Sequence, residues 1–272
     1  MAAPRNEFKQ ALAERRLQLG LWQALASPYA AEICAGSGFD WLLIDGEHAP
    51  NDLPLISAQI QAMRDSRAHP VVRPPVGEAW MLKQLLDAGA QSLLIPLIET
   101  EAQAQAMVRA VRYPPNGIRG VGAQLGRATA FNRTRDYFTS ADAEICLLLQ
   151  VETRAGIAAL DAIAAVEGVD GVFIGPADLA AGMGHIDNPR HPEVQAVIED
   201  AIARIQSHGK AAGILIGDME LSRRYAALGA TFVALGTDVG ALVAATQGLL
   251  AEFHASGADA AKPAPSLSSK YP

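Results

Sequence analysis

The chain contains few of the residues that mark secreted, disulfide-linked or membrane proteins. Cys34 and Cys146 are its only cysteines among 272 residues, and both stand in apolar segments. We therefore expect buried thiols in a reducing compartment rather than a disulfide. No uncharged run approaches the roughly 18 residues that span a membrane, and the polar first residues contain no apolar signal segment. These absences predict a cytoplasmic protein that is not associated with membranes.

Basic residues are also scarce. The formal net charge is −7, and no run of lysine and arginine forms a basic stripe, which argues against nucleic acid as a partner. The five lysines are Lys9, Lys83, Lys210, Lys262 and Lys270. Because none of them ends a predicted strand, a lysine Schiff base inside a barrel is disfavoured. The expected partners are small molecules.

Eight short apolar segments, each followed by a helical pattern, organise the chain. They cover residues 19–22, 41–45, 70–73, 92–96, 146–152, 171–175, 212–217 and 232–236. Continuous apolar character is typical of parallel strands that are covered on both faces, and many of the intervening helices end at glycine. Eight strand–helix units predict a single α/β domain, a (β/α)8 TIM barrel, over residues 1–255. A doubly wound open sheet is the alternative fold, but it rarely needs so many units.

One connection is much longer than the others. Residues 113–145 separate a predicted helix from the fifth strand, and a loop of this length is usually functional or forms an interface. We expect an active-site lid or a subunit contact there. Its GIRGVG segment could hold an anion, but it lacks both the dinucleotide fingerprint and the P-loop lysine. The Ala-, Pro- and Ser-rich residues 256–272 are expected to form a flexible tail.

Two acidic residues follow the apolar parts of consecutive predicted strands. Glu152 follows LLLQV, and Asp178 follows GVFIGPA. If these strands are neighbours in a parallel barrel, both carboxylates emerge at its C-terminal rim, where such barrels carry their chemistry. Two oxygen ligands with open positions suit a hard divalent cation such as Mg²⁺ or Mn²⁺. The sequence thus predicts a metal site at Glu152 and Asp178, the alternative being two solvated loop acids.

Further polar side chains are expected at the same rim. The segment IDGEHAP supplies Asp45, Glu47 and His48, and an imidazole suits general-base work, although a lone histidine is more often structural. Arg73 precedes two prolines and suits an anionic substrate or a developing enolate, the alternative being a structural ion pair. Asp87 ends a helix and is a candidate to orient His48 and raise its basicity.

A tight turn leads into Asp178. It consists of Gly175, Pro176 and Ala177, and its free backbone amides could receive a carboxylate, as anion-binding turns do. On the opposite side of the pocket, Trp22 and Leu215 come near the ends of the first and seventh strands. Both are candidates to line an aldehyde subsite, the alternative being that they belong to the core.

Several long motifs together resemble one family. IDGEHAP, VVRPP, QLLDAGAQSLLIP, RYPPNGIRGVG, QVETRAG and DGVFIGPADLAAGMG look like the metal-dependent pyruvate aldolases of the 4-hydroxy-2-oxoheptane-1,7-dioate aldolase family, of the HpcH/HpaI type. The resemblance covers roughly residues 6–255. It implies a (β/α)8 barrel whose last helix is exchanged between subunits of a homohexamer, and a divalent cofactor, Mg²⁺, Mn²⁺ or Co²⁺.

The resemblance also implies a role for individual residues. Glu152 and Asp178 would bind the metal, Gln150 and Ala177 would contact the substrate, Arg73 would stabilise the transition state, His48 would act as base, and Asp87 would tune His48. The sequence departs from the family pattern at none of these positions. Apart from the resemblance, Asp45 is a candidate to reach the substrate site of a neighbouring subunit.

The chemistry that these parts predict is reversible aldol cleavage. The cation withdraws charge from the keto group of pyruvate, His48 removes a methyl proton, and Arg73 stabilises the enolate that attacks an aldehyde. The expected substrate is 4-hydroxy-2-oxoheptane-1,7-dioate, which yields pyruvate and succinic semialdehyde. The alternatives are a 2-keto-3-deoxy-sugar-acid (rhamnonate-type) aldolase with the same mechanism and a non-catalytic barrel that binds oxo acids.

Overall fold

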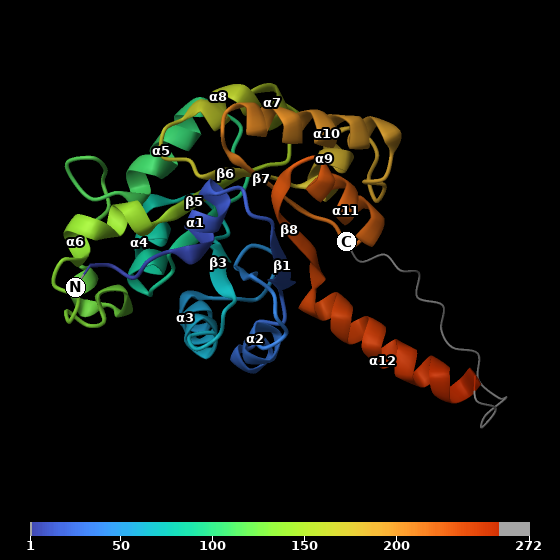
Figure 1. The fold of residues 1–272 in the computed structure, drawn as a ribbon, viewed down its shortest axis with the longest axis horizontal. Helices are drawn as coiled ribbons and strands as arrows, with labels where there is room; N and C mark the ends of the chain where they lie inside the picture. Colours follow the sequence, from blue (N-terminus) through green and yellow to red (C-terminus); the bar gives the residue numbers. More distant parts are fainter. Residues whose placement is uncertain (1, 256–272) are drawn as a thin grey trace.

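The computed structural model describes residues 2–255, which form a closed barrel of eight parallel strands in sequential order (Figure 1). The strands are β1 (Gln18–Gln23), β2 (Trp41–Asp45), β3 (His69–Arg73), β4 (Ser92–Ile95), β5 (Cys146–Val151), β6 (Gly171–Ile174), β7 (Ala211–Leu215) and β8 (Ala230–Thr237). Each coincides with a predicted apolar segment. The barrel prediction is confirmed, and the open-sheet alternative is wrong because β8 pairs with β1. The predicted tail, 256–272, lies outside the described residues.

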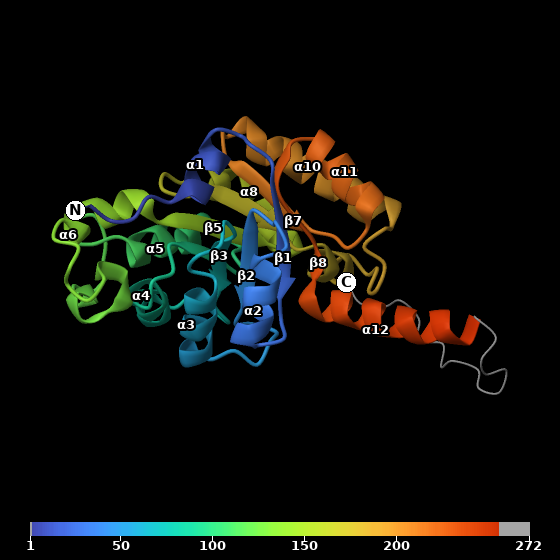
Figure 2. The ribbon, with the colours of Figure 1, turned by 60° about the horizontal axis from the view of Figure 1, so that its bottom comes forward.

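Helices surround the barrel (Figures 1 and 2). They are α1 (Glu7–Ala13), α2 (Pro28–Ala35), α3 (Leu53–Ala62), α4 (Ala79–Asp87), α5 (Glu101–Val111), α6 (Tyr137–Ser140), α7 (Arg154–Ala158), α8 (Leu160–Ala165), α9 (Pro176–Gly182), α10 (Pro192–Ser207), α11 (Met219–Ala227) and α12 (Asp238–Ala255). Local sequence sets their ends. The Thr100 side chain caps α5 within a capping box, and Gly89, with φ +104°, follows the last turn of α4, as C-terminal glycines do.

The core has two layers. One lies between the strands and the surrounding helices, and the other fills the inside of the barrel. The inner layer includes the rings of Trp41, Phe173 and Phe232 together with Phe8 of α1, whose ring centroid is 5.8 Å from that of Trp41. Because α1 precedes β1, it closes the N-terminal end of the barrel, and the open end is the one at which the strands finish.

The long connection before β5 is folded rather than extended. It contains α6 and three 3-10 turns, η1 (Ala123–Leu125), η2 (Arg127–Thr129) and η3 (Ala141–Glu144). Its centre is Arg119, which is fully buried, lies over the Tyr113 ring at 4.5 Å and donates a hydrogen bond to Asp87 at 2.8 Å. The connection therefore packs on the end of α4. Ile118, Val121, Leu125 and Phe131 remain exposed on its surface.

The last helix leaves the body of the protein. In both views α12 extends away from the barrel instead of covering it (Figures 1 and 2). Leu242, Leu249, Leu250 and Phe253 expose between 52% and 69% of their surface. An isolated helix of this apolar character is unusual in water. Within residues 2–255, no helix combines the length and apolar character needed to cross a membrane.

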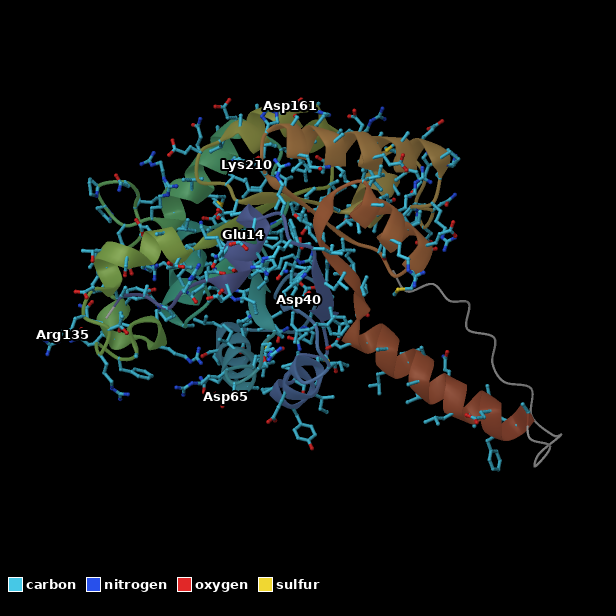
Figure 3. All side chains as sticks on the ribbon, viewed as in Figure 1. Glu14, Asp40, Asp65, Arg135, Asp161 and Lys210 are labelled. Carbon is cyan, nitrogen blue, oxygen red and sulfur yellow. The ribbon has the colours of Figure 1, made fainter. Side chains whose placement is uncertain are left out.

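Charged side chains lie mainly on the outside. Asp65, Arg135 and Asp161, for example, extend from the outer edge of the ribbon (Figure 3). Cys34 and Cys146 are both free; Cys146 is fully buried as expected, whereas Cys34 is only partly buried. The buried charged residues are therefore the exceptions that need explanation, and several of them gather at the open end of the barrel.

Candidate active site

The centre of the open end is an arginine held by two carboxylates. Asp45 ends β2, Arg73 ends β3, and the strand register places the two residues directly opposite each other. Nε of Arg73 donates to Oδ1 of Asp45 at 2.9 Å, and Nη2 donates to Oδ2 at 2.7 Å. Nη1 lies 2.8 Å from Oε2 of Glu47. This contact is an ion pair without hydrogen-bond alignment. A bidentate pair fixes both the position and the plane of the guanidinium.

Trp22 contacts both members of the Asp45–Arg73 pair. Its indole Nε1 donates to Asp45 Oδ2 at 3.2 Å, and the guanidinium lies 4.8 Å from the centroid of its ring. Trp22 is buried and also packs against Phe173. It therefore positions Arg73 and Asp45 and belongs to the inner core layer, and its role in an aldehyde subsite stays a prediction. Leu215 is half-buried and packs against the same inner layer.

The buried charges shift each other's protonation. Burial alone would raise the pKa of Asp45, but the hydrogen bonds and charge of Arg73 outweigh it, and the pKa is lowered. For Glu47 the balance is opposite: burial raises its pKa despite Arg73, and the negative charges of Asp45 and Asp178 add to the increase. Asp45 is thus the permanent counter-ion of Arg73, and Glu47 is the carboxyl group that holds a proton more readily.

Glu152 lies beside this cluster at the end of β5. Its Oε1 accepts the backbone N–H of Leu97 at 3.0 Å, and its Oε2 accepts the side-chain amide of Gln150. The side chain is 3% exposed. Burial, followed by repulsion from Asp178 and Glu47, raises its pKa despite these hydrogen bonds. Glu47 follows β2, Glu152 follows β5 and Asp178 follows β6, so the three carboxyl groups share the C-terminal end of the barrel.

The turn after β6 is shaped by this carboxylate. Gly175 is the N-cap of α9, and a Cβ added to it would lie 2.6 Å from Oε2 of Glu152. Only glycine permits this approach. Pro176 begins α9 and is buried, whereas Ala177 and Asp178 are exposed in its first turn. The amides of a first helical turn have no partner within the helix, which is compatible with the predicted contact between this turn and a substrate carboxylate.

His48 and Asp87 occupy different places in the chain's fold. His48 follows β2, and its side chain is 70% exposed, with Nε2 3.9 Å from Oε2 of Glu47. Asp87 ends α4, which runs back from the end of β3 toward the opposite end of the barrel. Within the described residues its side-chain partner is Arg119 and not His48. The single chain therefore does not form the His48–Asp87 contact that the sequence suggested.

Asp45 is held within its own barrel. Its side chain is 3% exposed and bonded to Arg73, and its contact with a neighbouring subunit's site stays a prediction. The sequence places Asp45 and Glu47 at the rim without indicating that they hold Arg73. A signal was available, since Asp45 and Arg73 end consecutive predicted strands and opposite charges at adjacent strand ends attract each other.

The residues present fit a divalent cation. Three carboxyl groups, those of Glu47, Glu152 and Asp178, repel each other around one end of the barrel. The side-chain oxygen of Gln150 is buried and has no hydrogen-bond donor among residues 2–255. Oxygen donors with excess negative charge are the ligands that Mg²⁺ and Mn²⁺ take in proteins. Glu152 and Asp178, the ligands predicted from the sequence, are two of these three carboxyl groups.

The lysines of the described chain are engaged elsewhere. Lys9 binds Asp170 at 2.8 Å, and Lys210 donates to the carbonyl of Val169 at 2.8 Å, both near the starts of strands. Lys83 is on the outer helix α4 and approaches Gly120. None of these three residues is placed at the open end to form a Schiff base, whereas Lys262 and Lys270 lie outside the described residues.

The chain is thus a closed α/β barrel in which Arg73 is paired with Asp45 and Glu47 at the end where the strands finish. Residues 18–245 match the family HpcH/HpaI aldolase/citrate lyase. The chain therefore belongs to this family, and the resemblance seen in its motifs is confirmed. The curated relatives reported below are named aldolases, so the chain is an enzyme of the lyase class.

Individual relatives are similar over nearly their whole length. A hydroxypyruvate/pyruvate aldolase from Pseudomonas aeruginosa is 56% identical over 269 residues, which are 99% of this chain and 98% of that protein. A 4-hydroxy-2-oxo-heptane-1,7-dioate aldolase from Escherichia coli is 53% identical over 258 residues, which are 95% and 98% of the two chains. The crystal structure of a family protein from Burkholderia cenocepacia J2315 superposes with a TM-score of 0.89 at 41% identity and covers 92% of this chain and 99% of that chain.

Proposed function

We propose that this chain is a divalent-metal-dependent aldolase that reversibly cleaves 4-hydroxy-2-oxo acids into pyruvate and an aldehyde. The observation that carries the proposal is the fixed guanidinium of Arg73 beside a cluster of buried and rim carboxylates at the open end of the barrel. Such a site combines the fixed positive charge of Arg73 with carboxylate ligands for a metal cation. It suits a reaction in which negative charge develops on the oxygen of a keto group.

Each residue has a defined task in this proposal. Glu152 and Asp178 hold the cation, which acts as a Lewis acid toward a keto group when it is bound. Gln150 and the turn formed by Gly175, Pro176 and Ala177 orient the substrate's carboxylate. Arg73 stabilises the developing enolate oxygen, and its clamp keeps it from moving during the reaction.

Proton transfer is assigned to His48. The side chain is exposed at the rim, so it can reach a methyl proton of pyruvate directly or through a water molecule. Glu47, 3.9 Å from its Nε2, is the acid that faces it within the chain. Tuning of His48 by Asp87 remains a prediction, and because the two residues are apart in one chain, it depends on contacts that a second subunit would make.

Two oxo-acid classes are candidate substrates. The first is 4-hydroxy-2-oxoheptane-1,7-dioate, cleaved to pyruvate and succinic semialdehyde, as the name of the Escherichia coli relative suggests. The second candidate uses hydroxypyruvate in place of pyruvate, and it is favoured by the names of relatives that are 56% and 58% identical. A 2-keto-3-deoxy-sugar-acid aldolase would use the same residues.

We also propose a cytoplasmic homohexamer in which α12 packs on another subunit. The exposed apolar residues of α12 support this assembly, because their burial removes apolar surface from water. Mn²⁺, Co²⁺ and Mg²⁺ are all candidates for the cation, since the donor set consists of oxygens.

The test combines a substrate panel with ligand variants. Retro-aldol activity is measured by pyruvate release from several 4-hydroxy-2-oxo acids, and aldol addition by consumption of pyruvate or hydroxypyruvate with succinic semialdehyde. Glu152→Gln and Asp178→Asn should abolish metal-dependent activity while circular dichroism shows an intact fold. Full activity of either variant after exhaustive chelation would refute the metal assignment. Metal-dependent pyruvate binding without methyl-proton exchange would instead support a non-catalytic barrel.

A further inference from the structure

Three polar side chains cluster outside the active site, on the connection between α9 and α10 and in the first turn of α10. They are His185, His191 and Glu193, and one ligand atom from each lies within 4.8 Å of the others. The two imidazole rings stack with a centroid distance of 3.5 Å and an interplanar angle of 13°. Nε2 of His185 lies 3.0 Å from Oε2 of Glu193. Two imidazoles and a carboxylate that converge in this way form a donor set for a metal ion.

The carboxylate of the cluster is ionised. The hydrogen bond from His185, together with the charges of both histidines, lowers the pKa of Glu193, so the carboxylate is ionised at neutral pH. The neighbouring cation, Arg190, is paired with Asp218 on the loop after β7 and does not occupy the cluster. The ionised carboxylate is thus one of three donor groups whose ligand atoms lie close together.

The spacing is close to that of a coordinated ion. In a tetrahedral zinc site with bonds of about 2.0–2.1 Å to nitrogen and oxygen, neighbouring ligand atoms are roughly 3.3 Å apart. The 3.0 Å contact between His185 and Glu193 is near this value, whereas the two stacked imidazole rings must turn out of their parallel arrangement for both ring nitrogens to point at one ion. Imidazole donors select Zn²⁺, Co²⁺ or Ni²⁺ over Mg²⁺, which distinguishes this cluster from the all-oxygen site at Glu152 and Asp178.

One existing contact opposes binding. Nδ1 of His191 accepts the backbone N–H of Glu193 at 3.3 Å and caps α10. A metal on Nδ1 would replace this hydrogen bond, and a metal on Nε2 would place the proton on Nδ1 and end it as well. The contact is at the long end of the hydrogen-bond range, so its loss costs little. Metal bonds to two imidazoles and a carboxylate exceed this cost.

We propose that His185, His191 and Glu193 form a second metal site that takes Zn²⁺, Co²⁺ or Ni²⁺, with water completing the coordination. The site links the connection to the start of α10. The connection is already attached to α9 through the N–H of His185, which donates to the carbonyl of Ala180 at 2.8 Å. Because α9 carries Asp178 in its first turn, an ion here would restrain the element that supplies one active-site carboxylate. The proposal does not depend on the proposed function.

The test is zinc titration of the Glu152→Gln/Asp178→Asn double variant, which removes the proposed oxygen site. We expect one equivalent of Zn²⁺ to bind by calorimetry with micromolar or tighter affinity. Co²⁺ should give visible absorption typical of nitrogen ligation. His185→Phe in this background keeps a ring against His191 but removes the donor, and should weaken Zn²⁺ binding at least about tenfold. His191→Ala is less informative because it also removes the cap of α10.

His208→Ala is the matched control. His208 follows the other end of α10, about 24 Å away along its 16 residues, where it contacts Asp161 at 3.0 Å. The His208→Ala variant, made in the same background, should bind zinc as tightly as the double variant does. Equal affinity in the His185→Phe and His208→Ala variants would overturn the proposal. This holds whether both variants bind zinc normally or both bind it equally weakly. The proposal would also be overturned if the double variant did not bind zinc below about 0.1 mM.

Discussion

Asp45 and Arg73 face each other across the ends of β2 and β3 and form a buried bidentate ion pair with distances of 2.9 and 2.7 Å. The pair turns a flexible side chain into a fixed positive charge. The site would lose this property if either strand shifted by one residue, because the two side chains would then point to opposite faces. The position of the Arg73 guanidinium therefore depends on the register between β2 and β3.

Removing the charge of Asp45 should affect both activity and stability. Asp45→Asn leaves Arg73 buried with Glu47 as its remaining carboxylate, so we expect a decrease in kcat of about 10²-fold and a loss of about 3 kcal/mol of unfolding free energy. Steady-state retro-aldol kinetics and urea unfolding measure the two effects. Trp22→Phe is the control, since it removes one hydrogen bond but keeps the ring under the guanidinium, and should cost about 1 kcal/mol. Unchanged kinetics in Asp45→Asn would contradict the role of the clamp.

Gly175→Ala should weaken metal binding. The added Cβ would lie 2.6 Å from Oε2 and 2.7 Å from Cβ of Glu152, so both the carboxylate and the turn must shift, and metal affinity should fall by about 10–100-fold. Gly182→Ala lies at the end of the same helix and meets no atom within 4 Å. It should bind metal normally and be slightly more stable, by up to about 1 kcal/mol. Calorimetric Mn²⁺ titration compares them, and equal affinities would show that Glu152 is not a ligand.

His48 should control proton transfer without controlling metal binding. In His48→Ala we expect loss of most deuterium exchange into the methyl group of pyruvate, measured by NMR with saturating metal and no aldehyde. The fold should not change, because the side chain is 70% exposed. Undiminished exchange would assign the base elsewhere.

Asp87→Asn tests the predicted tuning of His48 against the contact that the structure shows. We expect a partial loss of methyl exchange, smaller than in His48→Ala. We also expect a loss of stability, because fully buried Arg119 loses its carboxylate partner. Exchange per folded molecule and the midpoint of thermal unfolding are measured on the same sample. Lower stability with unchanged exchange would limit Asp87 to its contact with Arg119.

The exposed apolar residues of α12 predict assembly. Leu249→Lys should shift the protein to smaller species in sedimentation velocity and lower its thermal stability, because Leu249 is 69% exposed in the single chain and would be buried against another subunit. Gln247→Lys, an exposed polar position on the same helix, should leave assembly intact. A stable and active monomer at micromolar concentration would exclude the hexamer.

Acid stability should depend on His69. Its ring stacks on Phe8 and contacts Ser92, and burial lowers its pKa from 6.5 to about 4. The unfolded chain therefore binds more protons between these values, and stability falls as the pH decreases from 6.5 toward 4. The full shift corresponds to about 3 kcal/mol, and partial exposure of the residue should make the effect smaller. His69→Gln should flatten this dependence in unfolding titrations, whereas a parallel curve would assign acid sensitivity to other groups.

The sequence by itself determined the barrel. Eight continuous apolar segments separated by helical patterns indicate parallel strands, because each strand is covered on both faces and its side chains must be apolar regardless of direction. The same pattern placed Asp45, Arg73, Glu152 and Asp178 at strand ends, since parallel strands all finish at one end of a closed barrel.

Only the tertiary structure decided which of these side chains touch. The pairing of Asp45 with Arg73 follows from the β2–β3 register, and the close approach of Gly175 to Glu152 follows from the path of the turn after β6. The contact of Asp87 with Arg119 joins residues that are 32 positions apart. Local periodicity carries no information on such contacts, because it fixes the face on which a side chain lies and not the neighbour that the fold brings to it.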